Sequence, residues 1–343
     1  MLKSLLWQTY FLAPNLLISQ FPRVNWEICF KRSFGRLIAL SLAVLSLACS
    51  QSQETVGDGI SDSQKKIKVV ATVNMVSDLV RQVGGDHVEL VEIMGPGVDP
   101  HLYKASANDV IKLQEADVIF HVGLLLEGKM EEVLDKLKTG GKPVYAVTRD
   151  IKRGRLLKPE EFEGYYDPHI WFEVLLWKDT VDVIVEGLSK LDSTRQVDYE
   201  NNGKNLKARL DELHQWAKTK VAEVPQEKRV LVTSHDAYNY FGRAYGFKVV
   251  GLQGISTVSK AGLADRTKLV DFIRSQQVKA IFVETTVSPE AIKAIASDAG
   301  VVVGGELFSD AMGELGQMEG GLDLGSYEGM IRHNITTIVN ALR

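Results

Sequence analysis

The stretch Val98-Asp99-Pro100-His101-Leu102-Tyr103 recurs later in the chain as Tyr166-Asp167-Pro168-His169-Ile170-Trp171. In each copy the proline has a fixed φ of about −65° and pushes the preceding aspartate towards extended backbone. The histidine side chain therefore extends from a stiff, non-helical backbone segment. A phrase of this kind used twice indicates two similar halves, each of which presents a histidine from a loop.

Two later residues complete a candidate set with these histidines. They are His235, in Val232-Thr233-Ser234-His235-Asp236, and Asp310, in Gly305-Glu306-Leu307-Phe308-Ser309-Asp310. The four positions are separated by 68, 66 and 75 residues along the chain. Imidazole nitrogen together with carboxylate oxygen suits first-row divalent metals. We interpret the set as a metal site built from the loops of two similar halves.

The composition is that of a globular protein, and the length is sufficient for two domains. A chain of 343 residues exceeds the length at which a single core stops growing. The formal net charge of −4 argues against a nucleic-acid surface, which needs an excess of basic residues. Both cysteines, Cys29 and Cys49, precede the folded part, so a metal bound there must be held by nitrogen and oxygen.

Strand-like and helix-like segments alternate through the folded part. Strands are predicted at 66–72, 88–93, 116–122, 229–233, 247–251, 279–284 and 300–304. Helices are predicted at 75–83, from 106, and at 172–191, 237–245, 265–277, 288–299 and 327–342. Such alternation indicates parallel sheets with helices on both faces, and ligands bind at the carboxyl ends of their strands. The candidate ligands lie in loops, and His235 and Asp310 follow predicted strands.

A long charged segment separates the two runs of alternation. Residues 193–224 contain one glycine and no proline, and the preceding Asp192 is a suitable helix cap. A helix of roughly 30 residues would be ~45 Å long, enough to pack along two lobes. We therefore predict an α/β fold with two lobes, 66–192 and 225–343, each with a mainly parallel sheet flanked by helices, joined by this linking helix.

The N-terminal residues 1–49 read as an extension and a signal peptide. Lys31, Arg32 and Arg36 precede an apolar run at 37–48 that is too short to span a bilayer. The ending Leu45-Ser46-Leu47-Ala48-Cys49 resembles a bacterial lipobox, which would place a lipid on Cys49. The alternative is ordinary signal-peptidase cleavage nearby. Residues 50–65 are polar and read as a flexible tether.

Two functions remain open from the residues alone. Four protein ligands with no required open position suit a binding site better than a catalytic one. The alternative is a secreted metal-dependent hydrolase in which Glu306 or Asp236 serves as general base. The compact His-Glu-x-x-His signature of such enzymes is absent, as are nucleotide-binding glycine motifs and the Gly-x-Ser-x-Gly nucleophile motif.

Other residues near the candidate ligands could support a metal site without binding the metal. Asp99, Asp167 and Asp236 could orient the imidazoles, or could cap turns or face solvent. Glu284, at a strand end, is a possible cleft residue. Trp171 and Phe172 are expected to shield the site by packing. The remaining histidines are expected not to bind metal; they are His87, His121, His214 and His333.

From Ile67 to Leu342 the chain resembles the substrate-binding proteins of zinc and manganese ABC importers, the TroA-like or cluster A-I family. The resemblance rests on the two Asp-Pro-His phrases and on the segments around His235 and Asp310. It implies a metal bound in the cleft between two lobes by His101, His169, His235 and Asp310, and delivery to a membrane permease driven by an ATPase.

We accordingly expect a non-enzymatic, monomeric protein that binds Zn²⁺ or Mn²⁺ as cargo and has no nucleic-acid partner. It would be extracytoplasmic and anchored through Cys49, in the periplasm or on the outer face of the cell membrane. Zinc is expected to bind more tightly in vitro. Zinc-specific members often have a histidine-rich loop after the first ligand, and residues 145–166 contain no histidine, so the physiological metal stays open.

Overall fold

The computed structural model describes residues 65–162 and 164–343. The predicted signal peptide, its Cys49 and nearly all of the predicted tether lie outside this part of the chain. Within the described residues, no helix combines the length and the apolar character needed to cross a bilayer.

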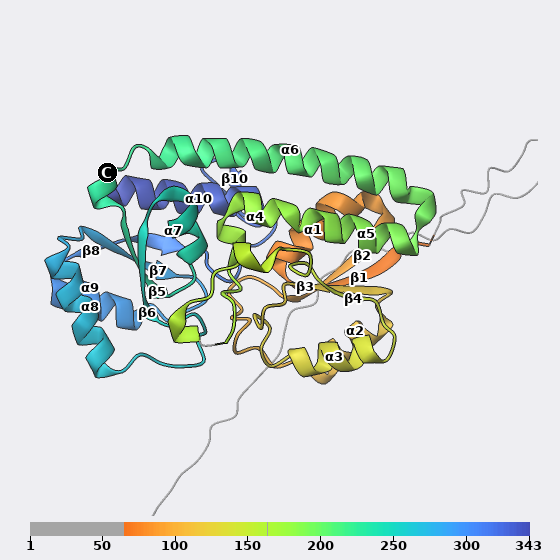
Figure 1. Ribbon diagram of the computed structural model, residues 1–343, viewed down its shortest axis with the longest axis horizontal. Coiled ribbons are helices and arrows are strands. Elements are labelled where there is room, and N and C mark those ends of the chain that lie inside the picture. Colours follow the sequence, from red (N-terminus) through yellow and green to blue (C-terminus); the bar gives the residue numbers. More distant parts are fainter. Residues whose placement is uncertain (1–64, 163) are drawn as a thin grey trace, which may run out of the picture. The chain divides into compact units, whose positions relative to one another are not determined.

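The N-terminal half is built on a four-stranded parallel sheet in the order β2-β1-β3-β4 (Figure 1). Its elements are β1 (Ile67–Val73), α1 (Asn74–Gly84), β2 (Val88–Met94), α2 (Ala107–Glu115), β3 (Val118–His121), α3 (Glu131–Thr139), β4 (Val144–Ala146), α4 (Val174–Asp179) and α5 (Val181–Leu191). Every residue of β1 except Lys68 is buried, as expected for a central strand covered on both faces. Helices α1 and α5 lie on one face of the sheet, and α2 and α3 on the other.

The C-terminal half repeats the alternation with two parallel strand pairs, β5-β6 and β7-β8. Its elements are β5 (Val230–His235), α7 (Asn239–Tyr245), β6 (Lys248–Gln253), α8 (Leu263–Ser275), β7 (Ala280–Glu284), α9 (Glu290–Ala299), β8 (Val302–Leu307), β9 (Met318–Glu319), β10 (Leu322–Asp323) and α10 (Tyr327–Leu342). Strands β5 and β7 lie side by side although β6 comes between them in the chain. The α/β fold predicted from the sequence is thus confirmed.

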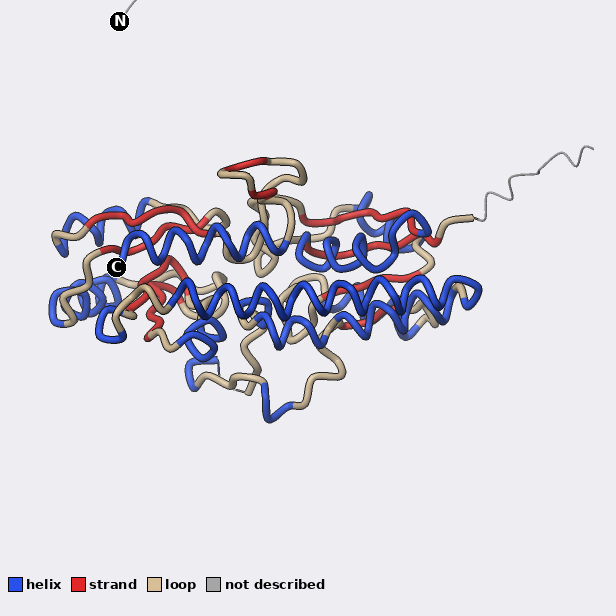
Figure 2. Tube along the Cα trace, turned by 90° about the horizontal axis from the view of Figure 1, so that it is seen from above, coloured by secondary structure: helices blue, strands red, loops and turns tan. Residues whose placement is uncertain are grey.

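Helix α6 (Gln196–Val221) joins the two halves with 26 residues, about 39 Å at 1.5 Å per residue. It packs on α1, α4 and α5 of the N-terminal half and on α10 of the C-terminal half (Figures 1 and 2). Gly203 permits the contact with α5, since a Cβ there would lie 2.6 Å from Val185 Cγ2. The buried stripe is Tyr199, Gly203, Leu206, Leu210, Leu213, Ala217 and Val221.

The predicted bounds of this helix, 193–224, were too wide at both ends. Ser193–Arg195 form a separate 3₁₀ turn, and the α-helix ends at Val221. The lobe boundaries at 66–192 and 225–343 stay a prediction.

Three further elements differ from the sequence-based expectation. The predicted helix 172–191 is divided into α4 and α5 at Thr180, whose backbone N–H donates to the carbonyl of Trp177 at 3.0 Å, the spacing of a tighter 3₁₀ turn. Helix α3 with strand β4, and the short antiparallel β9-β10 hairpin, were not predicted.

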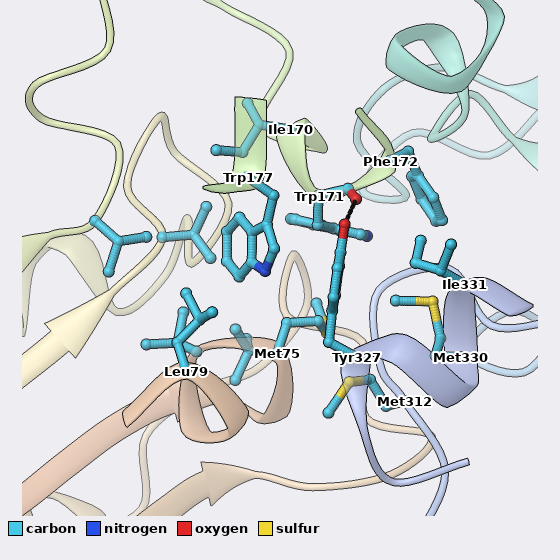
Figure 3. Close-up of a cluster of buried hydrophobic side chains, with 14 of the residues drawn as sticks. Met75, Leu79, Ile170, Trp171, Phe172, Trp177, Met312, Tyr327, Met330 and Ile331 are labelled. Carbon is cyan, nitrogen blue, oxygen red and sulfur yellow. Dashed lines mark hydrogen bonds between the residues drawn. The ribbon is translucent and has the colours of Figure 1, made fainter. Parts of the chain in front are cut away.

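Aromatic side chains tie the segment after His169 to the C-terminal helix (Figure 3). Trp177 and Tyr327 pack with ring centroids 5.9 Å apart, and both are buried. The hydroxyl of Tyr327 also donates to the carbonyl oxygen of Trp171 at 2.6 Å. The backbone that follows His169 is therefore held from both halves of the chain.

Candidate metal centre

The two Asp-Pro-His phrases form the same local turn. Asp99 Oδ1 accepts a hydrogen bond from the backbone N–H of His101 at 2.9 Å. Asp167 Oδ1 accepts the equivalent bond from His169, also at 2.9 Å. An aspartate that bonds the backbone two residues on is a recurrent turn device, which explains the spacing within the phrase. Asp167 additionally contacts His169 Nδ1 at 2.8 Å, so that Nε2 is the ring nitrogen available for a ligand.

His235 is held in a different way, at the end of β5. Its backbone N–H donates to Glu284 Oε1 at 2.9 Å, and its Nδ1 contacts Glu284 Oε2. Glu284 is the last residue of β7, so the neighbouring strand supplies the carboxylate. Gly251 on β6 allows the backbones to approach, because a Cβ there would lie 2.5 Å from the amide nitrogen of Asp236.

Asp310 lies at the point where the three imidazoles meet. Its Oδ2 lies 3.2 Å from His235 Nε2 and 3.7 Å from His101 Nε2. Its Oδ1 lies 3.3 Å from His169 Nε2. One ligand atom from each of the four residues lies within 4.8 Å of all the others. The structure thus brings together the four residues that the sequence singled out.

The candidate ligand residues are withdrawn from water, and some of their polar atoms lack hydrogen-bond partners. His169 and His235 are 0% exposed, Asp310 1% and His101 3%. His235 Nε2 and both carboxylate oxygens of Asp310 make no hydrogen bond of normal geometry. Buried polar atoms without partners are costly, and a cation bound among them would satisfy all three. The donor set therefore fits a divalent metal ion.

The electrostatics of the four residues are strongly coupled. Burial lowers the pKa of His101 to about 3. Burial also disfavours the charged form of His169, but Asp167 and Asp310 outweigh it and raise the pKa of His169 to about 9. Burial raises the pKa of Asp310, but its interactions with His235 and His169 outweigh this effect and hold that pKa well below its usual range. A bound cation would replace the protons shared in this cluster.

Several hydrogen bonds connect the halves beside the four-residue cluster, among them those from the side chains of Asn239 and Tyr240 to Asp167. The hydroxyl of Thr257 donates to Asp99 Oδ2 at 2.6 Å, across 158 residues of sequence. The indole N–H of Trp171 donates to the carbonyl of Ser309 at 3.0 Å, directly before Asp310. Trp171 and its neighbour Phe172 are buried, in line with the predicted shielding role.

The residues given secondary roles by the sequence divide into two groups. Asp167 and Glu284 contact imidazole rings. Asp99 contacts the backbone of its histidine, and Asp236 accepts from Asn239 Nδ2 at 3.0 Å. Glu306, one of the two general bases considered for a hydrolase, is exposed.

The remaining histidines stand outside the four-residue cluster. His87 pairs with Asp198 at 3.4 Å, and His333 Nε2 contacts the carbonyl oxygen of Glu306 at 3.1 Å. His121 belongs to a separate group of acidic residues, described below.

Comparison with known proteins places the chain among metal-transport proteins. Residues 69–341 match the family model described as zinc-uptake complex component A, periplasmic. The manganese-binding lipoprotein MntA of Bacillus subtilis (strain 168) is 45% identical over 286 residues, 82% of this chain and 91% of MntA. The zinc-binding protein TroA of Treponema pallidum (strain Nichols) is 43% identical over 296 residues, 85% of this chain and 92% of TroA.

The chain belongs to the TroA-like family of zinc/manganese ABC substrate-binding proteins. The solved structure of the periplasmic zinc-binding protein TroA from Treponema pallidum superimposes with a TM-score of 0.77, covering 81% of this chain and 99% of TroA. A Mn-bound periplasmic metal-binding protein from Candidatus Liberibacter asiaticus, 26% identical, gives a TM-score of 0.70 over 81% of this chain and 100% of its own. The TroA-like fold therefore extends over essentially all described residues.

Proposed function

We propose that this chain captures zinc or manganese outside the cytoplasm and delivers it to an ABC permease driven by an ATPase. The observation that carries the proposal is the convergence of four buried ligand atoms, from His101, His169, His235 and Asp310, within 4.8 Å of one another. Three imidazole nitrogens and one carboxylate oxygen can form the near-tetrahedral shell that zinc accepts. A bidentate Asp310 would raise the coordination number and admit manganese.

The surrounding residues support capture in a defined geometry. Asp167 and Glu284 each accept from the Nδ1 of a ligand histidine, which directs Nε2 to the metal and makes it more basic. Burial of the site excludes water that would compete for the cation. Binding would release protons from the cluster, and reopening between the halves would return the metal to water.

Anchoring at the membrane is part of the proposal. Several relatives bear the name lipoprotein, and in this chain Cys49 follows the apolar segment of the predicted signal peptide. Incorporation of labelled palmitate into the full chain, lost in Cys49→Ser, would test it. Light scattering of the purified protein would test the proposed monomeric state.

We also propose that the chain catalyses nothing. Four buried residues each supply a ligand atom to one centre, and four protein ligands fill the tetrahedral shell in which a catalytic zinc keeps one position for water. Family membership supports a binding protein over the hydrolase considered from the sequence. A metal-dependent hydrolytic turnover that disappears in Asp310→Asn would favour the enzyme instead.

Elemental analysis after saturation and desalting is the direct test of capture. We expect one equivalent of the bound zinc or manganese to depend on the four ligand residues, so that the metal content falls by one equivalent in His169→Ala. His87→Ala is the matched control, because it removes an imidazole outside the cluster. An unchanged metal content in His169→Ala, or a lower one in His87→Ala, would contradict the ligand assignment.

A further inference from the structure

A second group of potential ligands lies at the end of β3. His121 is the last residue of that strand, Glu127 lies in the loop that follows, and Glu131 is the first residue of α3. One ligand atom from each lies within 4.8 Å of the other two. None of the three belongs to the set formed by the four residues described above.

His121 supplies the observation that points to a ligand. The residue is 8% exposed, and its Nδ1 is buried without any hydrogen-bond partner among the described residues. This nitrogen lies 3.7 Å from Glu127 Oε2, beyond hydrogen-bond distance. A gap of this size between a buried nitrogen and a buried carboxylate oxygen leaves both atoms available to a cation.

The two oxygens of Glu127 are used unequally. Oε1 accepts from the hydroxyl of Thr72 and from the backbone N–H of Val122, both at 2.7 Å. Oε2 accepts one longer bond, at 3.2 Å, from the backbone N–H of Gly123. The two bonds to Oε1 thus fix the carboxylate in place, whereas Oε2 can still bind a further partner on the side of His121.

The charges around His121 favour a cation. A cavity of about 320 Å³ adjoins it, lined among others by Glu131, Asp135 and Lys138. The cavity wall thus holds two carboxylates and one ammonium group, and Glu127 adds a third carboxylate beside His121. Burial lowers the pKa of His121, but Glu127 outweighs this effect and raises it, so a proton on the imidazole is the competing occupant.

We propose that His121, Glu127 and Glu131 hold a second divalent cation. One imidazole nitrogen and two carboxylate oxygens, with water completing the shell, suit zinc or manganese. Glu127 is rigidly held and Glu131 is half-buried, so the site is open to solvent on the Glu131 side. The cation would connect the end of β3 to the first turn of α3.

The test compares neighbouring glutamates on α3. Zinc alone is titrated calorimetrically into the full chain carrying His169→Ala and Asp310→Asn, and bound zinc is counted after desalting. We expect one remaining equivalent, which is lost when Glu131→Gln is added and kept when Glu132→Gln is added. Glu132 is the matched control because it lies in the same turn and pairs with Lys136 instead. His121→Ala should also lose the equivalent, with the helical circular dichroism unchanged.

Three results would overturn the proposal. They are the absence of a remaining equivalent, its retention in Glu131→Gln, and equal loss in both glutamine variants, which would indicate general surface charge. Because the background already lacks two ligands of the first site, these outcomes do not depend on the proposed function. Failure of that function would instead appear as an unchanged stoichiometry on introducing His169→Ala and Asp310→Asn.

Discussion

Replacing Glu284 by glutamine isolates the contribution of a residue that touches no cargo. Glu284 is buried, accepts from the backbone N–H of His235 and contacts its Nδ1. Glutamine keeps the volume, and its amide oxygen can still accept from the backbone. Its NH₂ group would then face Nδ1 and donate to it, which moves the ring proton to Nε2. That tautomer offers no lone pair to the metal from Nε2.

The expected cost follows from this reversal. Residues that orient a ligand histidine typically change metal affinity by about 10- to 100-fold, or roughly 1.4–2.7 kcal/mol. We expect Glu284→Gln to lower the affinity for zinc by this factor. The affinity for manganese should fall similarly, because the change acts on His235 whichever metal binds. Competition against a chromophoric chelator measures both affinities.

The matched control is Glu306→Gln, which makes the same chemical change at an exposed position close to Asp310 in sequence. It should leave both affinities within twofold of wild type. If Glu284→Gln also stays within twofold, the tautomer argument for His235 is wrong. An equal loss in both variants would indicate a non-specific charge effect.

Four further predictions concern the ligands and the contacts around them. Wild type should bind zinc more tightly than manganese, His235→Ala should strongly weaken zinc binding, and His235→Glu should reduce the difference between the two affinities. A competition titration in which wild type prefers manganese would contradict this. Thr257→Val removes the bond to Asp99, and stopped-flow transfer to a chelator should show zinc release accelerated about tenfold, since a hydrogen bond to a charged group contributes about 1.5–3 kcal/mol. Tyr327→Phe leaves the carbonyl of Trp171 without its donor and should lower the free energy of unfolding by about 1–3 kcal/mol in urea denaturation, an effect absent if water replaces the hydroxyl. Small-angle scattering should show little compaction on metal binding because the continuous helix α6 packs on both halves and resists hinge rotation.

The parts of the site that could be predicted are those encoded by short-range chemistry. Asp99 and Asp167 each accept a hydrogen bond from the histidine two residues ahead, so both candidate ligands and their stiff loops can be recognised from a short local motif. His235 ends β5 and Asp310 follows β8, and the alternation of strands and helices places such positions at one edge of a sheet. Helix α6 is also predictable from local sequence, because residues 193–224 contain one glycine and no proline.

The parts that could not be predicted depend on which strands become neighbours. Glu284 orients a histidine 49 residues away, and does so only because β5 lies beside β7 although β6 follows it in the chain. Sequence periodicity predicts that both strands exist, but it does not show which strands become neighbours in the sheet. The sequence gives no sign of a site at His121 for a related reason: Glu127 lies in a loop and Glu131 begins α3, and periodicity does not place either of them beside the end of β3.

The same contacts suggest an order of events during release. Carboxylates hold the rings of His169 and His235 through Nδ1. Asp99 instead accepts from the backbone of His101 and from Thr257, so the first loop is fastened across the two halves rather than at the imidazole. Separation of the halves strains the Asp99–Thr257 bond and also the bonds that Asn239 and Tyr240 make to Asp167. Of the three rings, only that of His101 is not held by a carboxylate at Nδ1 among the described contacts. Release that begins at His101 needs only a small movement, which is what a rigid α6 permits.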